Sequence, residues 1–176
     1  MVSVPIVKLK FIVVKSKYFL LSILTLAFLS SSMPSGNSFL ETGKEVPSLN
    51  IKDTSGQLIE KRISGKNLIV NLWSSDDAKS RVRNIKLSKL MKTEAGKNVI
   101  FLSVCTDNDQ LLGNELKKLD GIDSHNILNL NRSDLSVNFL KLFQVESGNR
   151  LFLIDKKGIL KNIMPTEEEI LYFSHS

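Results

Sequence analysis

The residues best placed to carry chemistry lie in a short polar turn, Ser74-Ser75-Asp76-Asp77, between an apolar run and a helical segment. Oxygens of Ser and Asp side chains accept the free backbone N–H groups of a first helical turn. The turn therefore predicts a helix N-terminus with Asp77 as its cap, a role that Asp76 could share. Such N–H groups and the helix dipole stabilise an anion or a thiolate.

The elements around this turn predict an α/β fold with a mixed sheet. Short apolar runs predict five strands, and longer periodic segments predict four helices. The predicted strands are residues 68–73, 99–104, 127–130, 151–154 and 159–163. The predicted helices are residues 78–94, 110–119 and 135–143, and one that begins after Pro165-Thr166. The predicted apolar positions of the first helix are Val82, Ile85, Leu87, Leu90 and Met91. A Ser-Gly turn at residues 55–56 predicts a hairpin within residues 46–63.

A resemblance to a known family appears in the segment Gly65 to Ser75, GKNLIVNLWSS. This segment resembles the "GK-vvlvNFWasWCxxCR" region of the thioredoxin superfamily, and within it the exported TlpA-like thiol–disulfide oxidoreductases. Trp73 matches the Trp of that region, and Arg81 matches the Arg after its second Cys. The similarity extends over roughly residues 43–173. It implies a thioredoxin-like fold, with a central mixed sheet flanked by helices and an N-terminal β-hairpin extension.

The family's two redox cysteines correspond to Asp77 and Ser80, and its cis-proline to Asn149. Neither a carboxylate nor an unactivated hydroxyl exchanges with a disulfide, so the resemblance predicts a degenerate active site. A cis bond before a residue other than proline costs about 2.5–4 kcal/mol, so we expect Asn149 to be trans. The former active-site face is the predicted contact surface. Its residues are Trp73, Ser74, Ser75, Asp76, Asp77, Gly148, Asn149 and Arg150.

The chain contains one cysteine, Cys105, at the end of the second predicted strand. One cysteine cannot form an intramolecular disulfide or a CxxC pair. We expect Cys105 to be a small buried core residue, and no cofactor is predicted. The alternative is a redox role through Cys105 alone, by mixed disulfide with a partner protein.

Four carboxylates, those of Asp76, Asp77, Asp107 and Asp109, follow the ends of two strands that should be neighbours. Oxygen ligands at such a sheet edge could hold a hard cation. Helix capping accounts for the same residues without any metal, so no metal site is predicted. The sequence has only two histidines, His125 and His175, which lack a partner pattern and are expected at the surface.

The chain has 176 residues, of which 42% are hydrophobic and 24% charged, with a net charge of +6. Residues 1–32 contain four lysines and no acid, so the remainder is nearly balanced. A nucleic-acid partner is therefore not indicated.

Residues 1–32 resemble a secretory signal peptide, with lysines, an apolar run over 18–29 and then serines. The apolar run is shorter than the roughly 20 residues that span a bilayer, although an uncleaved anchor stays open as the alternative. Residues 33–42 are a predicted linker and residues 43–176 the domain. We therefore predict an exported protein of a bacterial periplasm or cell envelope, in contact with a membrane only if the leader is uncleaved. Its predicted role is non-catalytic binding or scaffolding of an envelope protein or peptide.

Overall fold

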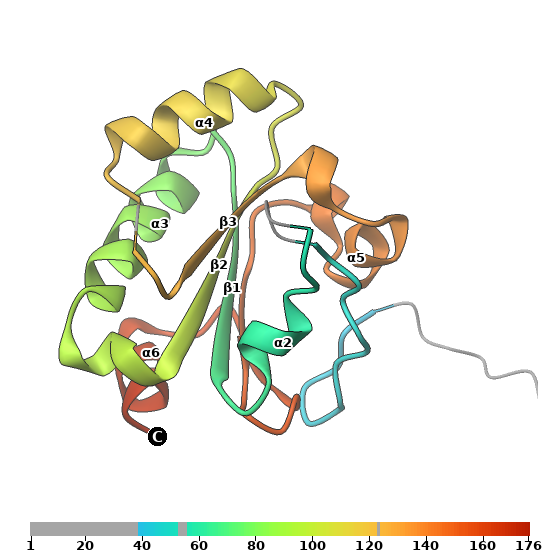
Figure 1. Cartoon of the computed structure of the whole chain (residues 1–176), viewed down its shortest axis with the longest axis vertical. Helices are drawn as coiled ribbons and strands as arrows, with labels where there is room; N and C mark the ends of the chain where they lie inside the picture. Colours follow the sequence, from blue (N-terminus) through green and yellow to red (C-terminus); the bar gives the residue numbers. More distant parts are fainter. Residues whose placement is uncertain (1–38, 53–55, 123) are drawn as a thin grey trace, which may run out of the picture. The chain divides into compact units, whose positions relative to one another are not determined.

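The computed structural model describes residues 39–52, 56–122 and 124–176, and the predicted leader lies outside these ranges. A five-stranded sheet in the order β3-β2-β1-β4-β5 forms its centre (Figure 1). The strands are β1 (Asn67–Trp73), β2 (Val99–Cys105), β3 (Ile127–Asn131), β4 (Leu151–Ile154) and β5 (Leu160–Ile163). β1, β2 and β3 are parallel, whereas β4 is antiparallel to β1 and β5. The predicted mixed α/β sheet is confirmed.

Helices cover both faces of the sheet. They are α2 (Glu60–Ile63), α3 (Ala78–Met91), α4 (Gln110–Leu119), α5 (Val137–Leu142) and α6 (Glu167–His175), with short 3₁₀ turns at Glu94–Asn98, Arg132–Asp134 and Val145–Ser147. α3 and α6 lie on one face, α2 and α5 lie on the other, and α4 crosses the end of the sheet (Figure 1). No helix within the described ranges has the length and apolar character that crossing a bilayer requires.

The central strand β1 is buried along its whole length because both of its faces are covered. Leu68, Val70 and Leu72 belong to the core on the α5 side, while Ile69 points into the core under α3 and α6. This alternation is the two-residue period of a strand. Packing on both sides holds the carboxyl end of β1, where the polar turn begins, in a fixed position.

The predicted N-terminal hairpin forms only in part. Lys52 and Leu58 make a single antiparallel bridge, and the N–H of Ile59 donates to the C=O of Ile51 at 2.9 Å. The described part of residues 46–63 contains no strand, and its last four residues form α2. Ile51 and Ile59 are fully buried, so core packing rather than a hydrogen-bonded ladder fixes this segment. Leu40, in the predicted linker, also packs against the core.

The inner face of α3 differs from the prediction. Its apolar positions were expected to include Val82, whose exposed fraction is 52%. Three polar residues one turn apart, Ser80, Asn84 and Ser88, are buried instead. The four-residue spacing places them on one helix face, and that face is turned toward the sheet.

Candidate functional site

Asp77 caps the N-terminus of α3, as predicted. Its carboxylate accepts the N–H groups of Lys79 at 3.0 Å and Ser80 at 3.2 Å. These bonds satisfy two of the N–H groups that a helix leaves free in its first turn. The carboxylate therefore occupies the position at which this helix end would stabilise a bound anion or thiolate.

Ser80 is buried, and both bonding capacities of its hydroxyl are used within the turn. Oγ donates to the C=O of Asp77 at 3.0 Å and accepts the N–H of Ser74 at 3.2 Å. No imidazole or amine lies among these partners, so nothing in them activates the hydroxyl as a nucleophile. Its contacts make Ser80 a structural element of the turn.

Asn149 joins three loops through its side-chain amide. Nδ2 donates to Ser74 Oγ at 2.8 Å and to Asp77 Oδ2 at 3.1 Å, and Oδ1 accepts the hydroxyl of Thr106 at 3.1 Å. The described residues include no cis peptide bond, so Asn149 is trans as expected. The hydrogen bond from Asn149, together with those from the helix N–H groups, holds the pKa of Asp77 below its usual value. Asp77 and Asn149 thus form a charge-assisted pair.

A second set of bonds ties the loop after β2 to the loop after β1. Both carboxylate oxygens of Asp107 accept the N–H of Ser75, at 3.0 and 3.1 Å. The N–H of Thr106 donates to the C=O of Trp73 at 2.9 Å, and the hydroxyl proton of Thr106 is shared between that C=O and Asn149 Oδ1, each at 3.1 Å. Bonds of this density between neighbouring loops leave the surface that they form largely pre-organised.

These loops line a groove of about 630 Å³. Its lining includes six of the eight residues of the predicted contact surface: Ser74, Ser75, Asp76, Asp77, Gly148 and Asn149. The other lining residues are Thr106, Asp107, Asn108, Asp109, Leu112, Arg132, Val145 and Glu146. Five carboxylates therefore face the groove against one guanidinium, which is paired with Glu146.

Two residues of the predicted contact surface do not line the groove. Trp73 is completely buried, and its indole N–H donates to Ser103 Oγ at 3.0 Å, so the prediction that it forms part of a contact surface is wrong. The all-buried β1 extends through Trp73, which places the indole in the interior. Arg150 is half-buried, and its C=O accepts the N–H of Leu72 at 2.8 Å as β4 joins β1.

A buried polar network under the groove was not predicted. Asn84 Oδ1 accepts from Asn71 Nδ2 and from Ser103 Oγ, each at 3.0 Å. Arg83 Nε donates to Asn71 Oδ1 at 2.7 Å, and the same guanidinium reaches the C=O of Asn149 at 3.4 Å. Burial lowers the pKa of Arg83, with the charge of Asp77 opposing it. The sequence signal that could have revealed this network is the spacing of Ser80, Asn84 and Ser88.

Cys105 is buried as expected, with an exposed fraction of 1%. Burial raises the pKa of the thiol to about 11, so the thiol is protonated at neutral pH. Its sulfur lies 3.5 Å from Asp107 Oδ2 and below Gly113 of α4, where an added Cβ would come within 2.8 Å of it. The structure therefore places the single thiol in the interior rather than in the groove.

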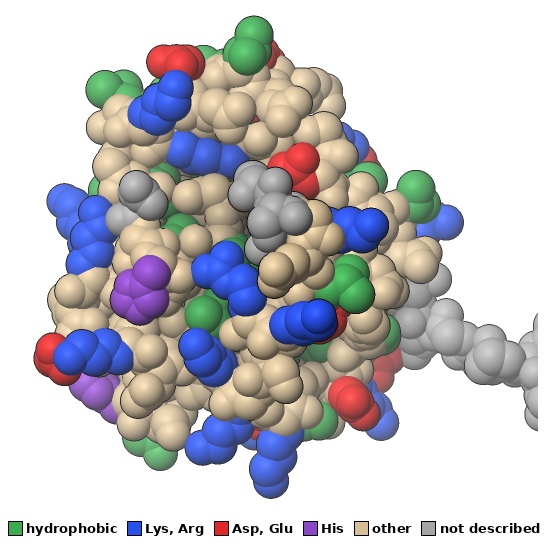
Figure 2. All heavy atoms as spheres, viewed as in Figure 1, with side chains coloured by type: hydrophobic (Ala, Val, Ile, Leu, Met, Phe, Trp, Pro, Cys, Tyr) green, Lys and Arg blue, Asp and Glu red, His purple; other side chains and the backbone are tan. Residues whose placement is uncertain are grey.

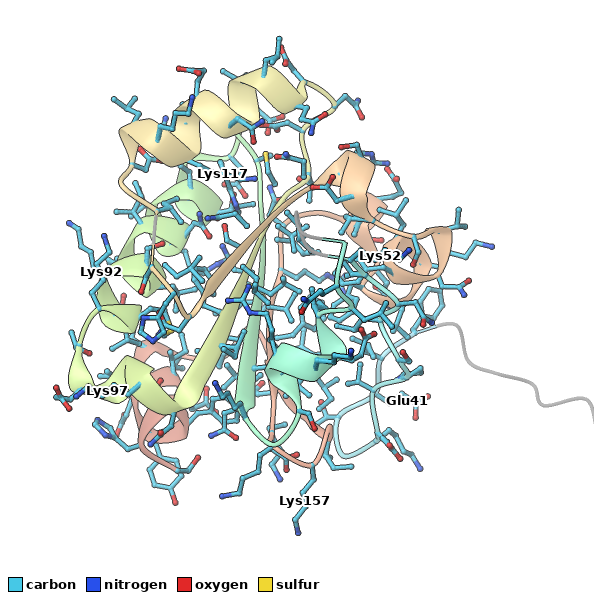
Figure 3. All side chains as sticks on the ribbon, viewed as in Figure 1. Glu41, Lys52, Lys92, Lys97, Lys117 and Lys157 are labelled. Atoms are coloured by element: carbon cyan, nitrogen blue, oxygen red, sulfur yellow. The ribbon has the colours of Figure 1, made fainter. Side chains whose placement is uncertain are left out.

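Lys117 is a buried cation that the sequence did not single out. Its ammonium donates to Asn131 Oδ1 at 2.7 Å and to the C=O of Leu130 at 3.0 Å. Figure 3 shows this side chain beneath α4, whereas Lys92, Lys97 and Lys157 extend outward. Burial lowers the pKa of Lys117. Together with Gly113, Lys117 fixes which face of α4 is turned toward the sheet.

The cation alternative gains no support from the geometry. Among the described residues, no group of three or more His, Cys, Asp or Glu side chains is arranged to share a metal ion. Asp109 caps α4 through the N–H groups of Leu111 and Leu112, and Asp76 accepts the hydroxyl of Ser74. His125 and His175 are exposed, as expected.

No protein-family model matches the chain, and no curated protein matches it. Several solved structures do match the chain. A thioredoxin-like protein from Parabacteroides distasonis is 18% identical, with a TM-score of 0.58, over 78% of this chain and 99% of that one. The thioredoxin domain of a thiol-disulfide oxidoreductase from Bacteroides vulgatus is 18% identical, with a TM-score of 0.58, over 76% and 94%.

A secreted disulfide oxidoreductase from Mycobacterium tuberculosis is 16% identical, with a TM-score of 0.55, over 72% of this chain and 94% of that one. The alignments span nearly the full length of each of these three neighbours. At this level of identity the similarity establishes the fold. The chain has a thioredoxin-like fold.

Proposed function

We propose that this protein is a non-catalytic binding protein of the cell envelope that has kept a thioredoxin-like fold and lost the dithiol chemistry. The observation that carries the proposal is the hydrogen bond of 3.1 Å between Asn149 Nδ2 and Asp77 Oδ2. By the resemblance, Asp77 stands at the first redox cysteine and Asn149 at the facing cis-proline. An amide donor and a carboxylate acceptor suit one another, so the two replacements fit as a pair.

The neighbouring position supports the same proposal. Thiol–disulfide exchange requires a thiolate to attack and a second sulfur to resolve the mixed disulfide. Ser80, at the place of the second cysteine, is buried, and its hydroxyl bonds to backbone groups of Asp77 and Ser74. Neither position supplies a sulfur, and each oxygen has a structural use.

The alternative function, redox chemistry through Cys105 with a partner protein, has weaker support. A thiolate is the reactive form of cysteine, and reactive cysteines lie at accessible sites that lower the thiol pKa. Cys105 combines burial with a pKa raised to about 11, which is the opposite combination. A partner could reach its sulfur only after α4 moved away.

The groove along the former active-site face is the proposed binding surface. It is concave, about 630 Å³ in volume, and bordered by loops that Asn149, Asp107 and Thr106 tie together. A pre-organised surface loses less conformational entropy on binding than a mobile one. We propose an envelope protein or peptide as its partner, with export directed by residues 1–32.

Insulin reduction and reactivation of scrambled ribonuclease test the loss of redox activity. We expect no turnover above the uncatalysed rate from the wild-type protein, and the same result from Cys105→Ser. An unmodified thioredoxin assayed in parallel shows that the conditions support turnover. Turnover by the wild type that Cys105→Ser abolishes would overturn the proposal and establish the Cys105 alternative.

A further inference from the structure

Helix α4 presents its apolar side to solvent. The exposed fractions are 78% for Leu111, 42% for Leu112 and 77% for Leu119. Successive residues of an α-helix are about 100° apart, so these three leucines and the half-buried Leu116 form one stripe along the helix. Figure 2 shows hydrophobic side chains at the top of the molecule, where Figure 1 draws α4. We call these four residues the leucine stripe.

The buried side of α4 explains this orientation. It consists of Gly113 and Lys117. Gly113 lies against Cys105, where even a Cβ would approach the sulfur to 2.8 Å, so a leucine cannot take its place there. The Lys117 ammonium bonds to Leu130 and Asn131 at the end of β3. These contacts hold α4 with its leucines outward, against the usual preference of a surface helix to bury its apolar side.

The leucine stripe continues into the acidic groove. Leu112 belongs to the stripe and also lines the groove. Two exposed carboxylates line the groove, that of Asp109, which caps α4, and that of Glu146, which pairs with Arg132. An apolar stripe beside carboxylates complements a segment with apolar residues on one side and Lys or Arg on the other.

We infer that α4 and the groove together dock a basic amphipathic segment of a partner protein. Its apolar side chains cover the leucine stripe, and its cations lie over the groove. This inference rests on the proposed function and names the class of partner. The carboxylates disfavour an anionic membrane surface by repulsion. A second copy of the chain is less suited, because Lys118, the exposed cation on α4, already pairs with Glu115 at 3.3 Å.

The test uses two labelled synthetic peptides of about 18 residues, long enough to form a helix. The first has leucine on one helical face and lysine on the other, and the second has glutamate at each lysine position. Fluorescence anisotropy measures their binding to the folded protein. We expect the lysine peptide to bind with an affinity that falls as salt rises, and the glutamate peptide not to bind.

Two double variants separate the parts of the surface. Leu111→Ser with Leu119→Ser removes the exposed ends of the stripe, and Asp109→Asn with Glu146→Gln removes two charges while Asn keeps the cap. We expect each to weaken binding of the lysine peptide by about tenfold or more. Leu171→Ser is the matched control, since Leu171 of α6 is 47% exposed and lies outside the groove. We expect it to bind the lysine peptide like the wild type.

Unchanged binding in the leucine variant, or equal binding of the two peptides, would overturn the inference. A wild type that sediments as a dimer while the leucine variant sediments as a monomer would also overturn the inference. Binding of phosphatidylglycerol vesicles by the wild type but not by the leucine variant would overturn it as well. If only the charge variant lost peptide binding, the leucine stripe would have no part in docking, whereas the proposed binding function of the groove would remain supported. Turnover in the insulin assay would reject the proposed function without changing the peptide result.

Discussion

Asn149→Ala should destabilise the protein by removing the amide that joins three loops. Asn149 makes three side-chain hydrogen bonds, to Ser74, Asp77 and Thr106, at 2.8 to 3.1 Å. A hydrogen bond contributes about 0.5–1.5 kcal/mol net. The half-buried Asp77 and Thr106 can turn to water after the substitution, whereas Ser74 is buried. We therefore expect a loss of about 2 kcal/mol in the free energy of unfolding at pH 7, in the lower part of the range of roughly 1.5–4.5 kcal/mol for three such bonds.

The pH dependence of this loss identifies its source. The pKa of Asp77 is lowered in the folded protein, first of all by Asn149. A lowered pKa contributes stability that is present above the unfolded pKa and is lost as the pH falls through the folded pKa. In Asn149→Ala the pKa of Asp77 should move up toward its ordinary value. The difference in the free energy of unfolding between the wild type and Asn149→Ala should therefore be smaller at pH 3 than at pH 7.

Urea unfolding at pH 7 and pH 3, with an NMR titration of the Asp77 carboxyl, measures both effects. Asn162→Ala is the matched control, because its amide donates to one exposed carboxylate, that of Glu169, at 2.8 Å. We expect the control to change stability by less than about 0.5 kcal/mol and to leave the Asp77 titration unchanged. A stability of Asn149→Ala equal to that of the control, or an unshifted Asp77 pKa, would refute the reasoning.

Three further predictions concern the same end of the sheet. Asp77→Ala should cost about 1 kcal/mol in urea unfolding, whereas Asp77→Asn should recover most of that loss, because Asn also caps a helix. Gly113→Ala should be neutral or destabilising, since the gain of about 1 kcal/mol from helix propensity is offset by contact with Cys105. In a Cys105→Ala background, where the contact of the added Cβ with Asn131 Oδ1 at 3.3 Å remains, the same substitution should be more favourable than in the wild type, and an unchanged effect would contradict the clash with Cys105. Thiol labelling of Cys105 at pH 8 should be slow in the folded protein and fast in urea, and rapid labelling of the folded state would show that the thiol is accessible.

Local signals in the sequence predicted much of this fold. The strands and α4 follow from apolar runs and from caps such as Asp109, whose interactions lie within a few residues. Asp77 was predicted as the cap of α3 for the same reason. The N-terminal hairpin was overpredicted because burial of Ile51 and Ile59 requires no strand ladder. Strand propensity alone does not distinguish these two ways of fixing a segment.

The interactions that were missed depend on contacts between distant parts of the chain. Asn149 meets Asp77 across 72 residues, and Asn84 meets Ser103 across 19. Periodicity assigned Val82 to the inner face of α3 because it is apolar, but Asn71 and Ser103 on the sheet give polar residues a buried place there. In α4 the same rule fails because Cys105 leaves room only for glycine. In both helices, the facing strand determines which side is buried.

The proposed loss of dithiol chemistry leaves the electrostatic character of the site in place. A helix N-terminus stabilises negative charge whether the anion is a thiolate or a carboxylate. In this chain the anion is the carboxylate of Asp77, which is bound to two helix N–H groups and to Asn149. A carboxylate held in this way caps the helix and ties the loops together, but it is no nucleophile for a disulfide. The electrostatics that would activate a thiol here instead stabilise the wall of an acidic groove, which supports the proposed binding function.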